Sequence, residues 1–315
     1  MDVQLRPKPR SVPLIIGCAL GTALCSMLIG CVTSTTTKQA GAENQLQRAI
    51  AILAMRTDAD SLAAAGLLSI PSHRDESLSP ITRALEAEPE RPDLVWLQSQ
   101  VCRESPPCDP VPMERRLREL DPSNGAGWMG ALARANSAKD DEAKGAALTA
   151  ISHSDHVDIY WTTIIAHLWR AIDGTKVLSP WQAEVTVIGV LAAQAIPAYL
   201  PIGNACKGER LQRREIIEVC RGIAISLERG DTYVTEMIGV GIAKRVWPED
   251  SPEWRAAADA RRLYEYRAKA SAQLEAWSVT HADQTLAMYA HNRSEQDVLL
   301  AQLVATGKNP NPPPQ

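Results

Sequence analysis

The sequence of 315 residues contains no phenylalanine, and aromatic residues make up only 4% of it. Strands draw on aromatic and β-branched side chains, whereas Ala-rich segments favour helices, so this composition disfavours a β-rich fold. The sequence also lacks an excess of positive charge, with 33 Lys and Arg against 37 Asp and Glu. Since nucleic acids bind to basic surfaces, we expect no nucleic-acid partner.

Catalytic and cofactor-binding motifs are absent as well. The sequence has no Gly-x-Gly-x-x-Gly fingerprint, no phosphate-binding Walker loop, no His-Glu-x-x-His zinc motif and no Gly-x-Ser-x-Gly elbow. The best candidate for a metal site is the segment 153–158, which holds His153, Asp155, His156 and Asp158. Such residues at a turn between helices more often serve as caps. We therefore expect no metal, no cofactor and no catalytic residue.

The N-terminal part of the sequence has the pattern of an export signal. Three basic residues among the first ten precede the apolar segment 12–30. This order of charged and apolar segments is typical of a secretory signal peptide. The segment ends in Leu-Ile-Gly-Cys, with the cysteine at Cys31. These four residues resemble the lipobox of bacterial lipoproteins, which implies cleavage after Gly30 and attachment of lipid to Cys31.

The same resemblance implies a cellular location for the protein. The residue after the cysteine is Val32 rather than Asp, which in enterobacterial lipoproteins implies transport to the outer membrane. We expect residues 1–30 to be a signal peptide. We expect residues 31–44, which are mostly small and polar, to be a lipidated flexible tether on the periplasmic side of the outer membrane. An uncleaved N-terminal anchor is the alternative that the sequence leaves open.

Four cysteines follow the lipobox, namely Cys102, Cys108, Cys206 and Cys220. The periplasm is oxidising, so an even number of cysteines favours two disulfides. Three pairings are possible, and we favour the two local ones, Cys102–Cys108 and Cys206–Cys220. A zinc site is the less favoured alternative, because Cys-x-x-Cys spacing and a nearby histidine are missing.

Tryptophans mark a repeat in the first half of the chain. Trp96, Trp128 and Trp161 lie 32 and 33 residues apart, and each follows a polar turn between two helical segments. The period resembles the ~34-residue unit of tetratricopeptide repeats, although the usual Gly and Tyr positions differ. The resemblance covers residues 45–172 and implies a TPR-like α–α superhelix with a concave groove. Packing between helices is the favoured role of the tryptophans, and a ligand-facing stripe, which would make them weak binding candidates, is the alternative.

The remaining sequence predicts further helices. We expect a bundle-like helical domain over residues 173–306 and a Pro-rich extended tail over residues 307–315. The segment Trp181–Leu200 is strongly apolar, with one charged residue, and we interpret it as a buried helix rather than a membrane span. Ser251 and Pro252 predict the start of a long helix that runs to about Thr280. The predicted fold class is therefore all-α.

These features together predict a function that does not involve catalysis. We expect non-catalytic binding of a protein partner at the inner face of the outer membrane, as an adaptor or assembly scaffold. A periplasmic immunity protein that neutralises a secreted cell-wall-degrading effector is the first alternative. A peptidoglycan-acting enzyme is the third possibility.

Overall fold

The computed structural model describes residues 43–71, 74–103, 105, 108–195, 199–274 and 280–313. Residues 45–315 form one compact unit. The predicted signal peptide, Cys31 and nearly all of the tether lie outside the described residues. Every regular element among the described residues is a helix, which confirms the all-α class.

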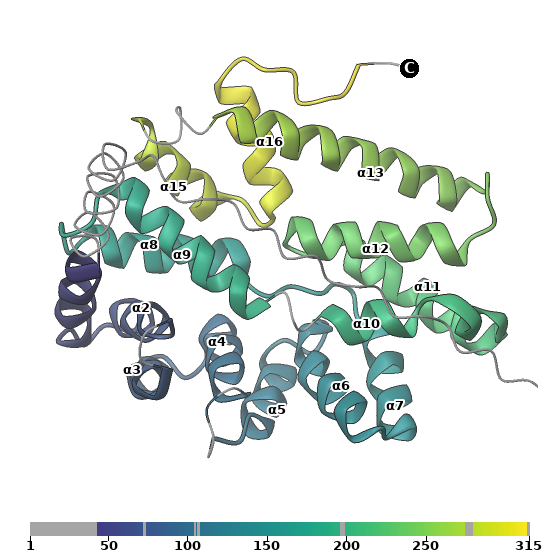
Figure 1. Cartoon of the computed structure of the whole chain (residues 1–315), viewed down its shortest axis with the longest axis horizontal. Coiled ribbons are helices and arrows are strands. Elements are labelled where there is room, and N and C mark those ends of the chain that lie inside the picture. The colour runs from purple at the N-terminus through teal and green to yellow at the C-terminus, as the bar shows by residue number, and fades with distance from the viewer. Residues whose placement is uncertain are drawn as a thin grey trace, which may run out of the picture. The chain divides into compact units, whose positions relative to one another are not determined.

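The first helices of this unit form a series of neighbouring hairpins (Figure 1). Helical residues 45–54 come first. The next six helices pack in sequence order, and each of the first five contacts the helix that follows it, as expected for an α–α superhelix. They are α2 (Ala59–Ser69), α3 (Arg74–Ala87), α4 (Pro92–Arg103), α5 (Val111–Leu120), α6 (Ala126–Ala138) and α7 (Asp141–Ser152).

After α7, the spatial order of the helices departs from the order in the sequence. The next helix, α8 (Trp161–Asp173), packs against α2, whereas α7 packs against α11. The series then continues from α11 through α12, α13 and α16 to α15, which packs against α8. The bounds of these helices are Arg214–Glu228 (α11), Tyr233–Val246 (α12), Pro252–Ser271 (α13), Glu295–Ala305 (α16) and Ala282–His291 (α15). The contacts form a closed circuit, so the array expected over residues 45–172 continues from α7 into α11 rather than into α8.

Two glycines permit the close packing of α11. Gly222 lies against the backbone of Ser152 at the end of α7. A Cβ on Gly239 of α12 would lie 2.7 Å from the backbone nitrogen of Glu228. Side chains at these positions would push the helices apart, because core packing leaves no room for added carbon atoms.

Helix α9 (Pro180–Ala195) lies among four other helices, α2, α4, α8 and α15. Its residues Ala183, Val187 and Leu191 are fully buried. The predicted buried helix is therefore confirmed over Pro180–Ala195, and residues 196–198 of the expected segment lie outside the described residues. Burial also raises the pKa of Glu184 on this helix to about 7. Among the described residues, no helix has the length and apolar character needed to span a membrane.

Both favoured disulfides are present. The Cα atoms of Cys102 and Cys108 lie 5.1 Å apart, and those of Cys206 and Cys220 lie 5.7 Å apart. The first bond closes the loop after α4. The second joins the end of the short helix α10 (Leu200–Ala205) to the middle of α11.

The helix boundaries at α13 and α11 show where local sequence decides the structure. The Ser251 side chain accepts a hydrogen bond from the backbone N–H of Trp254, as predicted. The helix after it is shorter than expected, because α13 ends at Ser271 and a 3₁₀ turn, η3 (Ala272–Leu274), follows. Similarly, residues before α11 form the 3₁₀ helix η2 (Gly208–Gln212), and the extended backbone of Arg213 separates it from α11.

Candidate functional site

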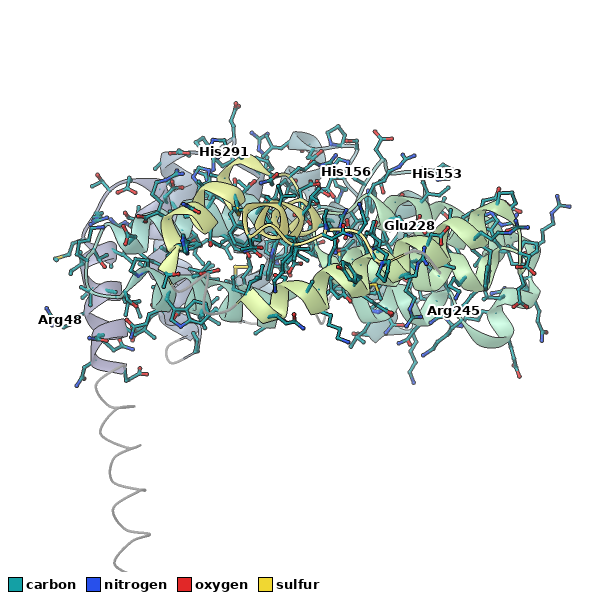
Figure 2. The ribbon with its side chains drawn as sticks, turned by 90° about the horizontal axis from the view of Figure 1, so that it is seen from above. Arg48, His153, His156, Glu228, Arg245 and His291 are labelled. Atoms are coloured by element: carbon teal, nitrogen blue, oxygen red, sulfur yellow. A yellow bond between two sulfur atoms is a disulfide. The ribbon has the colours of Figure 1, made fainter. Side chains whose placement is uncertain are left out.

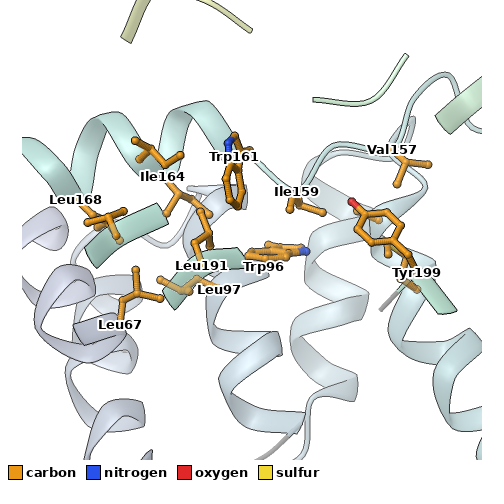
Figure 3. Close-up of a cluster of buried hydrophobic side chains, with 14 of the residues drawn as sticks. Leu67, Trp96, Leu97, Val157, Ile159, Trp161, Ile164, Leu168, Leu191 and Tyr199 are labelled. Carbon is orange, nitrogen blue, oxygen red and sulfur yellow. The ribbon is translucent and has the colours of Figure 1, made fainter. Parts of the chain in front are cut away.

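Two of the three repeated tryptophans are buried. Trp96 is 2% exposed and Trp161 is 6% exposed. Figure 3 shows Trp96 close to Leu97, Leu191 and Trp161 in the apolar core. A macromolecular partner cannot reach side chains this deep without opening the fold. Packing between helices, the favoured role, therefore fits Trp96 and Trp161, because burial of their large apolar surface stabilises it.

Trp128 has a different environment on α6. It is half-buried, and the guanidinium group of Arg118 stacks 4.4 Å from the centroid of its ring. Arg118 also donates a hydrogen bond of 2.8 Å to the carbonyl oxygen of Gly127. Of the three tryptophans, Trp128 is the one that keeps surface within reach of a partner, but it does not continue into a stripe.

The structure instead brings together turns that lie far apart in the sequence. Asn124, in the turn before α6, donates hydrogen bonds to the carbonyl oxygen of Asp158 at 2.8 Å and to the hydroxyl oxygen of Tyr160 at 3.1 Å. Its own Oδ1 accepts a hydrogen bond of 3.0 Å from the backbone N–H of Asp158. One buried amide therefore fixes the turn before α6 to the turn before α8.

A buried carboxylate from a third turn holds the start of α8. Asp231 is 2% exposed and accepts hydrogen bonds from the backbone N–H groups of Ile159 at 2.9 Å and Trp161 at 2.6 Å. The residue at the N-cap position, Tyr160, makes no capping bond and has a left-handed backbone with φ of 59°. Asp231 thus replaces a local cap, because free N–H groups at a helix start need an acceptor. The cap of α12 is provided by the neighbouring Thr232.

A fourth turn, before α16, joins the same set. The backbone N–H of Glu295 donates to the carbonyl oxygen of Asp231 at 2.9 Å. The hydroxyl of Thr162 donates to the carbonyl oxygen of Arg293 at 3.0 Å. We name the four connected turns, residues 121–125, 153–160, 229–232 and 292–294, the turn edge. In Figure 2, His153, His156 and His291 lie along one side of the ribbon.

A polar cavity of about 380 Å³ lies beside the turn edge, next to α8 and the end of α15. Charged and hydrogen-bonding side chains around it include Asp158, Thr163, His167, Arg170, Asn292 and Arg293.

The basic side chains of the polar cavity differ in how firmly they are held. Arg293 forms an ion pair of 3.1 Å with Asp158, and His167 Nδ1 lies 2.8 Å from Asp60. Arg170 is exposed, and its guanidinium group has no hydrogen-bond or ion-pair partner among the described residues. The Arg170 guanidinium is therefore the group in this cavity that is available for an anionic ligand.

Two carboxylates line the cavity, the half-buried Asp158 and the buried Asp231. Burial raises the pKa of Asp158, and the charges of His156 and Arg293 partly oppose that shift. Burial and then the charge of Asp158 raise the pKa of Asp231 to about 8, although the N–H groups of Ile159 and Trp161 act against it. Each carboxylate oxygen of Asp231 accepts a hydrogen bond from one of these N–H groups. These two bonds position the start of α8.

The histidines of segment 153–158 contact nearby turn and helix residues. His156 Nε2 lies 3.7 Å from Asp158 and 3.8 Å from Asp121, and His153 Nδ1 lies 2.7 Å from the carbonyl oxygen of Thr149. Within the described ranges, no group of three or more His, Cys, Asp or Glu residues is placed to hold a metal ion.

The sequence analysis did not identify three residues of this site. Arg170 lies on α8, and Asp231 and Arg293 lie in two turns of the C-terminal half. The available signal was the polar turn Gly230-Asp231, but nothing in the sequence shows that it faces residues 159–161. No family model, curated protein or solved structure matches the chain.

Proposed function

We propose that this chain is a non-catalytic lipoprotein that binds a protein partner at the periplasmic face of the outer membrane, as an adaptor or assembly scaffold. The observation that carries the proposal is the turn edge, in which Asn124 and Asp231 join distant turns into one surface beside a polar cavity. A surface that is already ordered loses little conformational freedom when a partner binds.

The chemistry of the cavity favours an acidic group on the partner. Arg170 is exposed without a partner of its own, and Arg293 lies on the same cavity. A guanidinium group matches the geometry of a carboxylate and can bind it through two parallel hydrogen bonds. An Asp or Glu side chain of the partner, or its C-terminal carboxylate, would therefore bind at Arg170.

Two features support the proposed location. The lipobox-like sequence ends at Cys31, which implies a lipid anchor. The chain also contains two disulfides, which persist in oxidising compartments such as the periplasm.

The pair Asp158 and Asp231 is the feature that favours the enzyme alternative, because paired carboxylates can act as acid and base. We assign the pair a structural role, since protonation changes at Asp231 would disturb the bonds that hold α8. Incubation of the full chain with peptidoglycan tests this assignment. Bond cleavage that is lost in Asp158→Asn would contradict it.

Crosslinking in the native bacterium tests the proposed function. A tagged full chain should retain one partner protein or a small set of partners in stoichiometric amounts. Arg170→Glu should lose them, because the substitution places a negative charge where an acidic group binds. Arg245→Glu, which alters an exposed arginine on α12, should retain them.

The identity of the retained proteins separates the two binding functions. Envelope proteins support an adaptor, and a secreted cell-wall hydrolase supports an immunity protein. No retained protein, or equal retention by wild type and Arg170→Glu, would contradict binding at the polar cavity.

A further inference from the structure

A second cavity, of about 360 Å³, is lined by residues of α7, η2 and α11. Three basic side chains, Lys144, Arg210 and Arg213, line it, together with the apolar side chains Leu148, Ile216 and Val219. We name this cavity the basic pocket. It shares no residue with the polar cavity at the turn edge.

The three cations of the basic pocket face a common space. Lys144 forms an ion pair with Asp141, and its side chain is 16% exposed. The bond and charge of Lys144, followed by the charges of Arg210 and Arg213, lower the pKa of Asp141. All three cations therefore act on a single carboxylate at the pocket.

The positive charge of the basic pocket is only partly neutralised. The guanidinium group of Arg210 has no hydrogen-bond or ion-pair partner among the described residues. The contact from Arg213 Nε to Glu215 is long, at 3.9 Å. Three lining cations against one lining carboxylate, Asp141, leave two positive charges for a ligand.

The disulfide gives the basic pocket a fixed wall. Cys220 lines the pocket, and its bond to Cys206 holds the end of α10 against α11. Arg210 and Arg213 follow that point within a few residues, in and just after η2. The covalent link thus restrains the segment that carries both arginines, which reduces the ordering needed on binding.

We propose that the basic pocket binds a phosphate monoester that carries an apolar organic group. A phosphate monoester has a charge close to −2 at neutral pH, which matches the two unneutralised positive charges better than a carboxylate does. The forked guanidinium groups of Arg210 and Arg213 suit phosphate oxygens. The apolar group would then cover Leu148, Ile216 and Val219, which gains hydrophobic free energy. This site does not depend on the proposed protein partner.

Calorimetric titration of the full chain with three soluble probes tests the proposal. Phenyl phosphate should bind about tenfold more tightly than inorganic phosphate, because only the former has an apolar group for the floor of the pocket. Dihexanoyl phosphatidic acid, used below its micelle concentration, is the third probe. Tighter binding of this probe than of phenyl phosphate supports a lipid headgroup as the source. The reverse order supports a soluble phosphate ester.

Substitutions locate the binding in the pocket. Arg210→Gln and Arg213→Gln should each weaken phenyl phosphate binding about tenfold. Asp141→Asn should strengthen this binding, because the substitution removes the carboxylate of the chain that competes for the three cations. A Cβ at Gly145 would meet no atom within 4 Å, so Gly145→Leu should fold and should occupy the apolar floor. This variant should remove the preference for phenyl phosphate over inorganic phosphate.

Arg245→Gln is the control, because it removes one positive charge from an exposed site outside the pocket. It should change the affinity less than twofold, as expected for a distant surface charge in salt. The proposal is overturned by the absence of binding or by equal affinity for inorganic and phenyl phosphate. A loss in Arg245→Gln as large as that in Arg210→Gln would also overturn it.

Discussion

The carboxylate of Asp231 accepts a hydrogen bond of 2.6 Å from the backbone N–H of Trp161, which lies 70 residues earlier in the chain. This bond, with the one from Ile159, fixes the start of α8 to the turn between α11 and α12. Helix α8 packs against α2 at one side and α15 at another. Asp231 therefore links the first hairpins to the last helices and defines the turn edge.

Replacement of Asp231 by Asn should destabilise the fold. The amide nitrogen of Asn carries donors and would face a backbone N–H, so at least one buried hydrogen bond is lost. We expect the free energy of unfolding to fall by about 2–4 kcal/mol. Urea denaturation followed by circular dichroism measures the change. Asp283→Asn, at an exposed position of α15, should change it by less than about 0.5 kcal/mol. Equal stability of the two variants would contradict the assigned role of Asp231.

Stability should decrease as the pH rises, because of Glu236 on α12. Its side chain is buried, and its Oε2 has no hydrogen-bond partner. Burial, and then the charges of Glu295, Asp297 and Asp231, raise its pKa to about 9. The folded state keeps a proton that the unfolded state releases above its ordinary pKa, so the free energy of unfolding falls between about pH 5 and pH 9.

Glu236→Gln should remove this part of the pH dependence. The variant should resemble the wild type near about pH 5 and be more stable than the wild type near about pH 8, since the amide stays neutral. Urea midpoints at several pH values measure the difference. Glu249→Gln, an exposed control, should follow the wild type. A difference between Glu236→Gln and the wild type that stays constant with pH would show that Glu236 does not titrate as described.

The two disulfides should contribute unequally to stability. The bond Cys206–Cys220 spans 14 residues, and the bond Cys102–Cys108 spans 6. Loss of the first, by Cys206→Ser with Cys220→Ser, should lower the free energy of unfolding by about 3 kcal/mol, and loss of the second should cost less because its loop is shorter. Thiol counting on the unreduced, denatured chain should find none of these four cysteines free. Detection of four free thiols would contradict both bonds.

The proposed lipid anchor makes a separate prediction about the cell. Metabolic labelling with palmitate should tag the wild type, because the sequence before Cys31 resembles a lipobox. Cys31→Ala should carry no label. Equal labelling of the two proteins would exclude Cys31 as the acylated residue.

Local sequence was sufficient for features that neighbouring residues decide. Ser251 with Pro252 marked the start of α13, and the close spacing of Cys206 and Cys220 indicated their bond. The helix class followed from composition and apolar periodicity. These features depend on capping, chain entropy and helix propensity, which act within a few residues.

The candidate site could not be predicted from local sequence. The period of the tryptophans predicted that the helix of Trp161 would follow α7 in the stack, whereas α11 takes that place. A sequence period shows which segments resemble one another, but it does not show which helices pack against each other. The capping of α8 by Asp231 and the contact of Asn124 with Tyr160 join residues separated by 70 and 36 positions. Long-range pairs of this kind arise from tertiary packing and leave no pattern in one sequence.

Site-specific photocrosslinking tests the proposed partner binding most directly. A photoreactive residue is placed at Thr163 or Asn292, which line the polar cavity, and at Val304, which is 60% exposed on α16 outside it. In the native bacterium, the cavity positions should both give an adduct with the same protein, and Val304 should not. An adduct from Val304 alone, or none from either cavity position, would contradict partner binding at the polar cavity.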